Sequence, residues 1–121
     1  MPEIFFKIDE IPWVLNDQGK NKTILDKAFL GSSSIRMTCI DPHKSYETHE
    51  HSFTQIMIFK SKHNGVVIID EIHEKVIEEN MVVVVKPNQC HKIINNSNKP
   101  MEILVIESYD SPQSSTPFVD F

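Results

Sequence analysis

The sequence has few cysteines, no run of basic residues and no long apolar run. Only Cys39 and Cys90 occur among 121 residues. Two cysteines so far apart form no disulfide framework and are typical of a reducing compartment. The apolar runs are too short to span a bilayer, and the N-terminus lacks the basic start and apolar core of a signal peptide. We therefore expect a cytoplasmic protein with no membrane partner.

Positive charge is also scarce. Lysine and arginine contribute 12 residues against 17 acidic ones, which gives a formal charge of -5 at pH 7. Because no basic patch is evident, nucleic acid is not expected as a partner. The length suits one domain with its own hydrophobic core. We therefore expect a single domain over residues 1–121, with a small molecule as its ligand.

Short apolar segments separated by turn-forming residues fill the chain from Ser33 onward. The segments are SIRMTCI, TQIMIF, GVVIID, EKVIEE, MVVVVK, HKIIN and MEILVIES. Asn64-Gly65 is the strongest hairpin signal between them. Four β-branched residues at 82–85, followed by Pro87, predict a strand buried on both faces. Seven or more short strands without a convincing long helix predict an all-β sandwich or small barrel.

The two ends of the chain are less regular. Residues 3–8 predict a short strand, and residues 23–30 predict either a helix or short edge strands. The last residues are rich in proline and serine, which is typical of a segment that runs loosely over the surface. We expect three parts: an N-terminal arm (1–32), a core (33–108) and a C-terminal tail (109–121).

One polar stretch, HEHSFTQ at residues 49–55, has the composition of a metal site. Side chains alternate between the two faces of a strand. In an unbroken strand, His49, His51 and Gln55 would therefore point the same way. Met57 and Phe59 share that parity and would lie beneath them. By the same alternation, Cys39, which shares parity with Ile35 and Met37, is expected to line the interior.

This stretch and a second one further along resemble the two motifs of the cupin superfamily. The first consists of His49, His51 and Gln55 followed by a strand and the turn KHNG at 62–65. The second consists of Asn80, the strand 81–85, the turn Lys86-Pro87-Asn88, His91 and Asn95. The resemblance covers roughly residues 33–108 and implies a double-stranded β-helix, the jelly-roll barrel of cupins.

The chain departs from the family pattern at three positions. Asn80 and Asn88 stand where the family usually has glycine, and asparagine is the residue next best able to adopt a positive φ. Gln55 stands where the family usually has glutamate. A neutral amide in place of a carboxylate leaves a bound ion with one more positive charge and raises its Lewis acidity.

The resemblance implies a metal site formed by His49, His51, Gln55 and His91. Three imidazoles and one oxygen ligand suit a divalent Fe, Mn, Ni, Zn or Co ion, with positions open for water and substrate. Ligand type alone does not choose among these metals. One competing interpretation is a cupin without metal, in which the histidines are exposed or hydrogen-bonded turn residues. Another keeps the metal but makes Gln55 a residue that only hydrogen-bonds to a ligand histidine.

Three kinds of function agree with these residues. The first is a metal-dependent enzyme acting on a small polar metabolite such as a sugar or sugar acid, by isomerisation or ring opening. The candidate catalytic residues are then His49, His51 and Tyr46, and Tyr109 and Asn95 could also face the pocket. A related version, in which the two histidines act as acid and base on a nucleotide sugar, is disfavoured because few cations are available for a diphosphate.

The other two are an iron-dependent dioxygenase and a non-catalytic module that senses or binds a small molecule. The metal itself would discriminate the dioxygenase from the first kind of enzyme, because iron favours oxygen chemistry. Cupins often pair, and the arm carries Phe5, Phe6, Trp13 and Phe29 as a plausible interface. We therefore expect a homodimer.

Overall fold

The computed structural model describes residues 5–109 of the chain. The elements found within these residues are η1 (Ile8–Glu10), β1 (Val14–Asn16), β2 (Gly19–Leu25), α1 (Lys27–Leu30), β3 (Ser33–Ile40), β4 (Ser45–His49), β5 (Thr54–Phe59), β6 (Val66–Ile69), β7 (His73–Val76), β8 (Met81–Val85), β9 (His91–Ile94) and β10 (Met101–Ser108). Almost all of the expected C-terminal tail, residues 110–121, lies outside the described part. No helix within residues 5–109 is long and apolar enough to cross a membrane.

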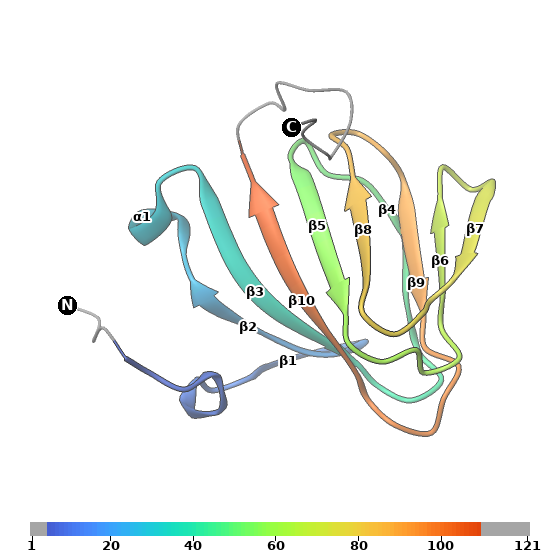
Figure 1. Cartoon of the computed structure of the whole chain (residues 1–121), viewed down its shortest axis with the longest axis horizontal. Helices are drawn as coiled ribbons and strands as arrows, with labels where there is room; N and C mark the ends of the chain where they lie inside the picture. Colours follow the sequence, from blue (N-terminus) through green and yellow to red (C-terminus); the bar gives the residue numbers. More distant parts are fainter. Residues whose placement is uncertain (1–4, 110–121) are drawn as a thin grey trace.

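The strands form two antiparallel sheets (Figure 1). The six-stranded sheet has the order β1-β2-β3-β10-β5-β8, and the four-stranded sheet has the order β4-β9-β6-β7. Neighbours in sequence such as β3 and β4 lie in different sheets, so the chain crosses repeatedly from one sheet to the other. This arrangement is a jelly roll. The all-β, jelly-roll prediction is confirmed.

Alternating side chains of both sheets form the hydrophobic core. Along β5, burial alternates so that Gln55, Met57 and Phe59 are buried while their neighbours are half-exposed. The core side chains are Ile40, Met57, Phe59, Val67, Ile77, Val85, Ile93, Met101, Ile103 and Val105. Because the pleat places every second residue inward, polar residues at inward positions also face the interior. Those exceptions form the candidate site.

Two turn and strand predictions are corrected by the sheet topology. β8 is the last strand of the six-stranded sheet, and Val82 is 56% exposed, so residues 82–85 are not buried on both faces. Asn64 and Gly65 do form a turn, in which the Gly65 amide donates to the Lys62 carbonyl at 2.7 Å. However, this turn joins β5 to β6 in the other sheet, so it is not a hairpin. Sequence signals located the reversal but could not say where the next strand pairs.

The N-terminal part is more regular than its sequence indicates. β2 pairs with β3, so residues 19–25 extend the six-stranded sheet, and the turn of helix α1 follows. The Asp26 side chain caps α1 by accepting from the Phe29 amide at 3.0 Å. The strand predicted over residues 3–8 is wrong where the structure describes it, since no strand includes residues 5–8 and η1 begins at Ile8. Buried Lys22 donates to the Ile8 carbonyl at 2.8 Å and fixes η1 against β2.

The two asparagines at expected glycine positions behave as predicted. Asn80 has a φ of 59° and Asn88 a φ of 63°. Both values lie in the left-handed region that asparagine tolerates better than most residues. The turn at Asn88 matters for function because it precedes β9, which begins with a histidine.

Candidate metal centre

Three histidines from separate segments meet at one end of the cavity between the sheets. His49 ends β4, His51 lies in the following loop and His91 begins β9. Their candidate ligand nitrogens all lie within 4.8 Å of one another. The ring centroids of His49 and His91 are 4.0 Å apart, and those of His49 and His51 are 4.8 Å apart. The structure thus brings together the three histidines that the motifs predicted, in a cluster that could hold a metal ion.

A β-bulge aims His49 into the cavity. In the β4–β9 ladder, Tyr46 pairs with Ile93 and His49 pairs with His91. Two residues of β4 therefore lie opposite the single residue Lys92, which defines a β-bulge. Strict alternation would put Tyr46 and His49 on opposite faces. The extra residue reverses that parity, so both side chains line the same cavity.

The strand expected to run unbroken from residue 49 to 55 is interrupted. Residues 50–53 form a loop, and β5 begins only at Thr54. The loop is held at His51, whose carbonyl accepts from the Asn88 amide at 2.6 Å. The His51 ring stacks on Phe53, with centroids 4.6 Å apart and planes inclined by 13°. The common direction of His49, His51 and Gln55 therefore comes from the loop and the bulge rather than from one continuous strand.

Backbone carbonyls fix the tautomers of two of the histidines. Nδ1 of His49 lies 2.7 Å from the Glu47 carbonyl oxygen, and Nδ1 of His91 lies 3.3 Å from the Gln89 carbonyl oxygen. A carbonyl oxygen only accepts, so Nδ1 carries the hydrogen and Nε2 carries the lone pair. Nε2 of His91 is buried and has no hydrogen-bond partner among the described residues. A buried, unpartnered lone pair is what a metal ligand presents before the ion binds.

The lowered pKa values of His51 and His91 favour the neutral form of these two side chains. Burial, followed by the nearby His49, lowers the pKa of His91 to about 4. Burial, again followed by His49, also lowers the pKa of His51. A histidine must be neutral to bind a metal, because protonation removes the lone pair. At pH 7 His91 therefore has no proton to lose before it can act as a ligand.

Gln55, the fourth predicted ligand, lines the same cavity and is buried. Its Nε2 donates to Oε2 of Glu107 at 3.3 Å. An ionised carboxylate only accepts hydrogen bonds, so Gln55 must present its NH2 group to Glu107. The amide oxygen is then the atom that Gln55 could offer to a metal. Three neutral imidazoles and one amide oxygen fit a divalent transition metal, whose identity the ligand types do not decide.

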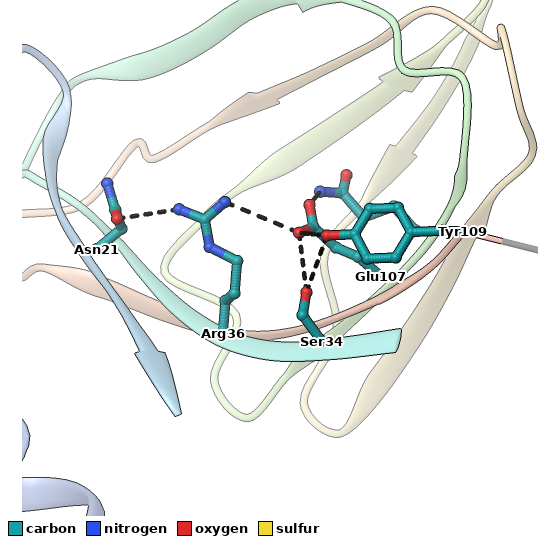
Figure 2. Close-up of polar contacts among 6 residues, drawn as sticks. Asn21, Ser34, Arg36, Glu107 and Tyr109 are labelled. Carbon is teal, nitrogen blue, oxygen red and sulfur yellow. Dashed lines mark hydrogen bonds and ion pairs between the residues drawn. The ribbon is translucent and has the colours of Figure 1, made fainter. Parts of the chain in front are cut away.

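The wall supplied by the six-stranded sheet carries a charged network around Glu107 (Figure 2). Oε1 of Glu107 accepts from Ser34 Oγ at 3.2 Å and from the Tyr109 hydroxyl at 3.3 Å. Arg36 Nη1 lies 3.8 Å from the same oxygen, and Arg36 Nη2 donates to Asn21 Oδ1 at 3.0 Å. Glu107 is 5% exposed, and such a buried carboxylate requires partners of this kind.

The histidine cluster and the wall supplied by the six-stranded sheet enclose one cavity of about 210 Å³. Its polar lining includes the three histidines, Gln55, Arg36 and Glu107, and its apolar lining includes Met57, Ile93, Ile103 and Val105. Tyr46, a predicted catalytic candidate, also lines it, and its hydroxyl accepts from Asn16 Nδ2 at 3.2 Å. The Tyr46 hydroxyl therefore keeps its own hydrogen to donate. The chemistry available is metal binding at one end and hydrogen bonding to a small polar molecule beside it.

Sequence reasoning missed Arg36 and Glu107. The parity of β3 was assigned to the wrong face: Arg36 and Thr38 line the cavity, whereas Cys39 is buried on the opposite side of the strand. Alternation separates two faces but does not say which one is inside. An available signal was that Arg36 is the only arginine in the sequence and lies between apolar residues in a predicted strand.

The two further candidates, Tyr109 and Asn95, have different roles. Tyr109 joins the Glu107 network through Ser34 and Glu107. Asn95 is fully buried outside the cavity lining, where its Nδ2 donates to the carbonyls of Ile40 and Lys99 at 3.0 and 2.9 Å. Asn95 therefore stabilises turns and does not face the ligand.

Several solved structures have the same fold as this chain. A predicted oxalate decarboxylase from Thermotoga maritima superimposes with a TM-score of 0.74 and 19% identity, over 87% of this chain and 98% of that one. An RmlC-like cupin from Shewanella frigidimarina gives 0.74 and 14%, over 90% and 93%. KdgF from a Halomonas species gives 0.71 and 13%, over 88% and 94%.

At the level of sequence, no family model matches the chain, and a search of curated proteins finds no match either. Identities this low establish the fold and leave substrate and reaction open. The two sheets and their agreement with these structures nevertheless settle the architecture. The chain has the RmlC-like jelly-roll fold of the cupin superfamily.

Proposed function

We propose that the protein is a metal-dependent enzyme that acts on a small polar metabolite such as a sugar or sugar acid, by isomerisation or ring opening. The observation that carries this proposal is the cluster of His49, His51 and His91 at the end of an open cavity, with Gln55 beside it. When bound, a divalent ion on neutral ligands would polarise a carbonyl or hydroxyl oxygen. His49, His51, Gln55 and His91 are the residues that would hold it.

The remaining polar side chains have the chemistry to handle protons. Isomerisation and ring opening both require a proton to leave one substrate atom and another to arrive at a second atom. Glu107 is the carboxylate of the cavity lining, and the Tyr109 hydroxyl donates to it. Tyr46 lines the cavity beside His49 and has a hydroxyl hydrogen to give. We assign proton transfer to these side chains and substrate orientation to the residues around them.

An iron-dependent dioxygenase is the second candidate. The apolar part of the lining, formed by Met57, Ile93, Ile103 and Val105, favours it, because dioxygen and an apolar substrate would both bind there. Three histidines are also an iron ligand set. The polar network around Glu107 favours the first candidate, because an apolar substrate would offer those polar groups no hydrogen-bond partner.

The test is to load the protein separately with zinc, nickel, manganese and iron and to incubate each form with a panel of uronates, unsaturated uronates and hexoses. Proton NMR in heavy water would detect ring opening, isomerisation or exchange of carbon-bound hydrogen. We expect turnover with at least one metal and none with the His51→Ala, His91→Ala double variant. Oxygen uptake by the iron form alone would support the dioxygenase. Binding without turnover in any form would leave the protein as a non-catalytic binding module.

A further inference from the structure

We infer that Arg36 is the binding site for a carboxylate group, so that the substrate is a small carboxylic acid and not a neutral sugar. The inference deepens the proposed function, and it rests on that function for the charge of the bound metal. Arg36 is the only arginine of the chain, and the fold places it in the cavity lining with the three histidines.

The guanidinium of Arg36 is held on one side by Asn21 and keeps further donors for a ligand. It has five N–H donors in a planar fork. One of them, on Nη2, donates to Asn21 Oδ1 at 3.0 Å. Nε is buried and has no hydrogen-bond partner among the described residues. The side chain as a whole is 36% exposed and lines the cavity, so its other N–H donors are open to a ligand there.

Glu107 forms an ion pair with Arg36 but no hydrogen bond. The separation of Arg36 Nη1 and Glu107 Oε1 is 3.8 Å, which is longer than a hydrogen bond. The oxygens of Glu107 already accept from Ser34, Tyr109 and Gln55. Figure 2 shows the Arg36 guanidinium extending from β3 between Asn21 and Glu107, with a dashed line to each, and the Glu107 carboxylate also contacting Ser34 and Tyr109.

The charges of the cavity favour an anion. Glu107 is the only carboxylate in the cavity lining formed by the described residues, and its charge cancels that of Arg36. Imidazole and amide groups carry no charge when they bind a metal, so a bound divalent ion would keep its full charge. A monoanionic substrate would compensate part of that charge, and a neutral sugar would not.

The shape of the site favours carboxylate over phosphate. One planar fork matches the two oxygens of a carboxylate, whereas a phosphate dianion usually recruits several cations or a row of backbone amides. The cavity lining contains no second lysine or arginine among the described residues, and its volume of about 210 Å³ suits a small molecule. A substrate with its carboxylate on Arg36 would have its other oxygens in the cavity that the three histidines also line.

The decisive experiment uses the single arginine as a reporter. With only one arginine in the chain, the Nε–Hε region of a 15N spectrum holds one folded-state side-chain signal, which needs no assignment. The zinc-loaded and metal-free proteins would each be titrated with D-glucuronate, D-glucuronamide, D-glucose and inorganic phosphate. We expect a saturable shift with glucuronate and none with the neutral amide or glucose. The shift should saturate at lower glucuronate concentration in the zinc form.

Two matched variants then measure the energetic effect by calorimetry. Arg36→Met removes the guanidinium, and Lys60→Met removes an exposed cation outside the cavity lining. Arg36→Met should weaken glucuronate binding about tenfold or more, the range for a charge-assisted hydrogen-bonded pair. Lys60→Met should leave binding unchanged. The zinc content of both variants should equal that of the unmodified protein.

Three outcomes would overturn the inference: no saturable Arg36 shift with glucuronate in either form, an equal shift with glucuronamide, or tighter binding of phosphate than of glucuronate. Failure of the proposed function looks different. If the protein binds no metal but the metal-free form still shows the glucuronate shift, the carboxylate site stands and the metal-dependent enzyme does not.

Discussion

The two walls of the cavity differ in how they are built. The histidine wall, from β4, β9 and the loop after β4, consists of three imidazoles, and the buried Nε2 of His91 has no hydrogen-bond partner among the described residues. The opposite wall, from β2, β3, β5 and β10, consists of charged and amide side chains joined by hydrogen bonds. A metal ligand keeps a lone pair free for the ion, while hydrogen bonds between neighbours fix the direction of polar side chains that contact a substrate. The difference suggests that one wall binds the metal and the other orients the substrate.

Removing histidines from the histidine wall should have the largest effect, which is the loss of bound metal. The His51→Ala, His91→Ala double variant deletes two of the three ligand nitrogens from the histidine wall. We expect the metal content to fall from about one ion per chain to a small fraction, because the remaining side chains cannot complete a site. Elemental analysis after desalting measures this content, and circular dichroism checks the fold. Full metal stoichiometry in the variant would show that the ligand assignment is wrong.

A substitution in the charged wall, the one formed by the six-stranded sheet, should weaken metal binding without abolishing it. Glu107→Gln removes the anionic acceptor that holds the Gln55 amide, so the Gln55 oxygen loses its fixed direction. Outer-sphere partners of this kind typically change metal affinity about 10- to 100-fold. The control is Glu102→Gln on the same strand, since Glu102 is exposed. Competition with a chelator measures the metal affinity of both variants. Equal metal affinities in the two would show that Glu107 does not support the metal site.

The pH dependence of stability should report on the histidine wall of the metal-free protein. The pKa of His91 is about 4 in the folded state, against an ordinary value of 6.5. Between these values the unfolded chain binds the proton and the folded chain does not, so stability falls as the pH drops through that window. Urea unfolding of the metal-free protein should therefore show a lower midpoint at pH 5 than at pH 7. His73→Asn, which changes an exposed histidine, should give the same difference.

A change remote from both walls should have the smallest effect on the site. Phe5 and Phe29 of the N-terminal part are 85% and 60% exposed, which agrees with an interface but does not demonstrate one. The homodimer stays a prediction, as does the cytoplasmic location. If it holds, the Phe5→Ala, Phe29→Ala variant should dissociate while keeping its metal. Light scattering after size exclusion measures this, and a monomer at micromolar concentration in the unmodified protein would refute the prediction.

The sequence predicted the histidine wall far better than the charged wall. His49, His51 and His91 could be found because two short motifs carry them at a fixed spacing. Arg36 and Glu107 could not, because they meet only through the pairing of β3 with β10, and the register of a strand pair is not visible in either strand alone. The β-bulge before His49 was invisible for the same reason. It is detected only when two residues of β4 are seen opposite one of β9.

The fold shows the same division between local and long-range information. Turn residues such as Asn80 and Asn88 identified where the chain reverses, because positive φ is a local property. Which sheet each strand joins is a long-range property. The turn at Asn64 and Gly65 therefore suggested a hairpin where the chain in fact changes sheets. The part of the arm that became β2 lacked alternation and is identified as a strand by its pairing with β3.

The most direct test of the account is elemental analysis of the untagged protein, purified without added metal or chelator. The account predicts close to one transition-metal ion per chain, bound by the histidine wall. Iron would favour oxygen chemistry, and zinc, nickel or manganese would favour isomerisation or ring opening. Protein that contains no transition metal, and that takes up none on dialysis against zinc, nickel, manganese or iron, would contradict the assignment of His49, His51, Gln55 and His91 as a metal site.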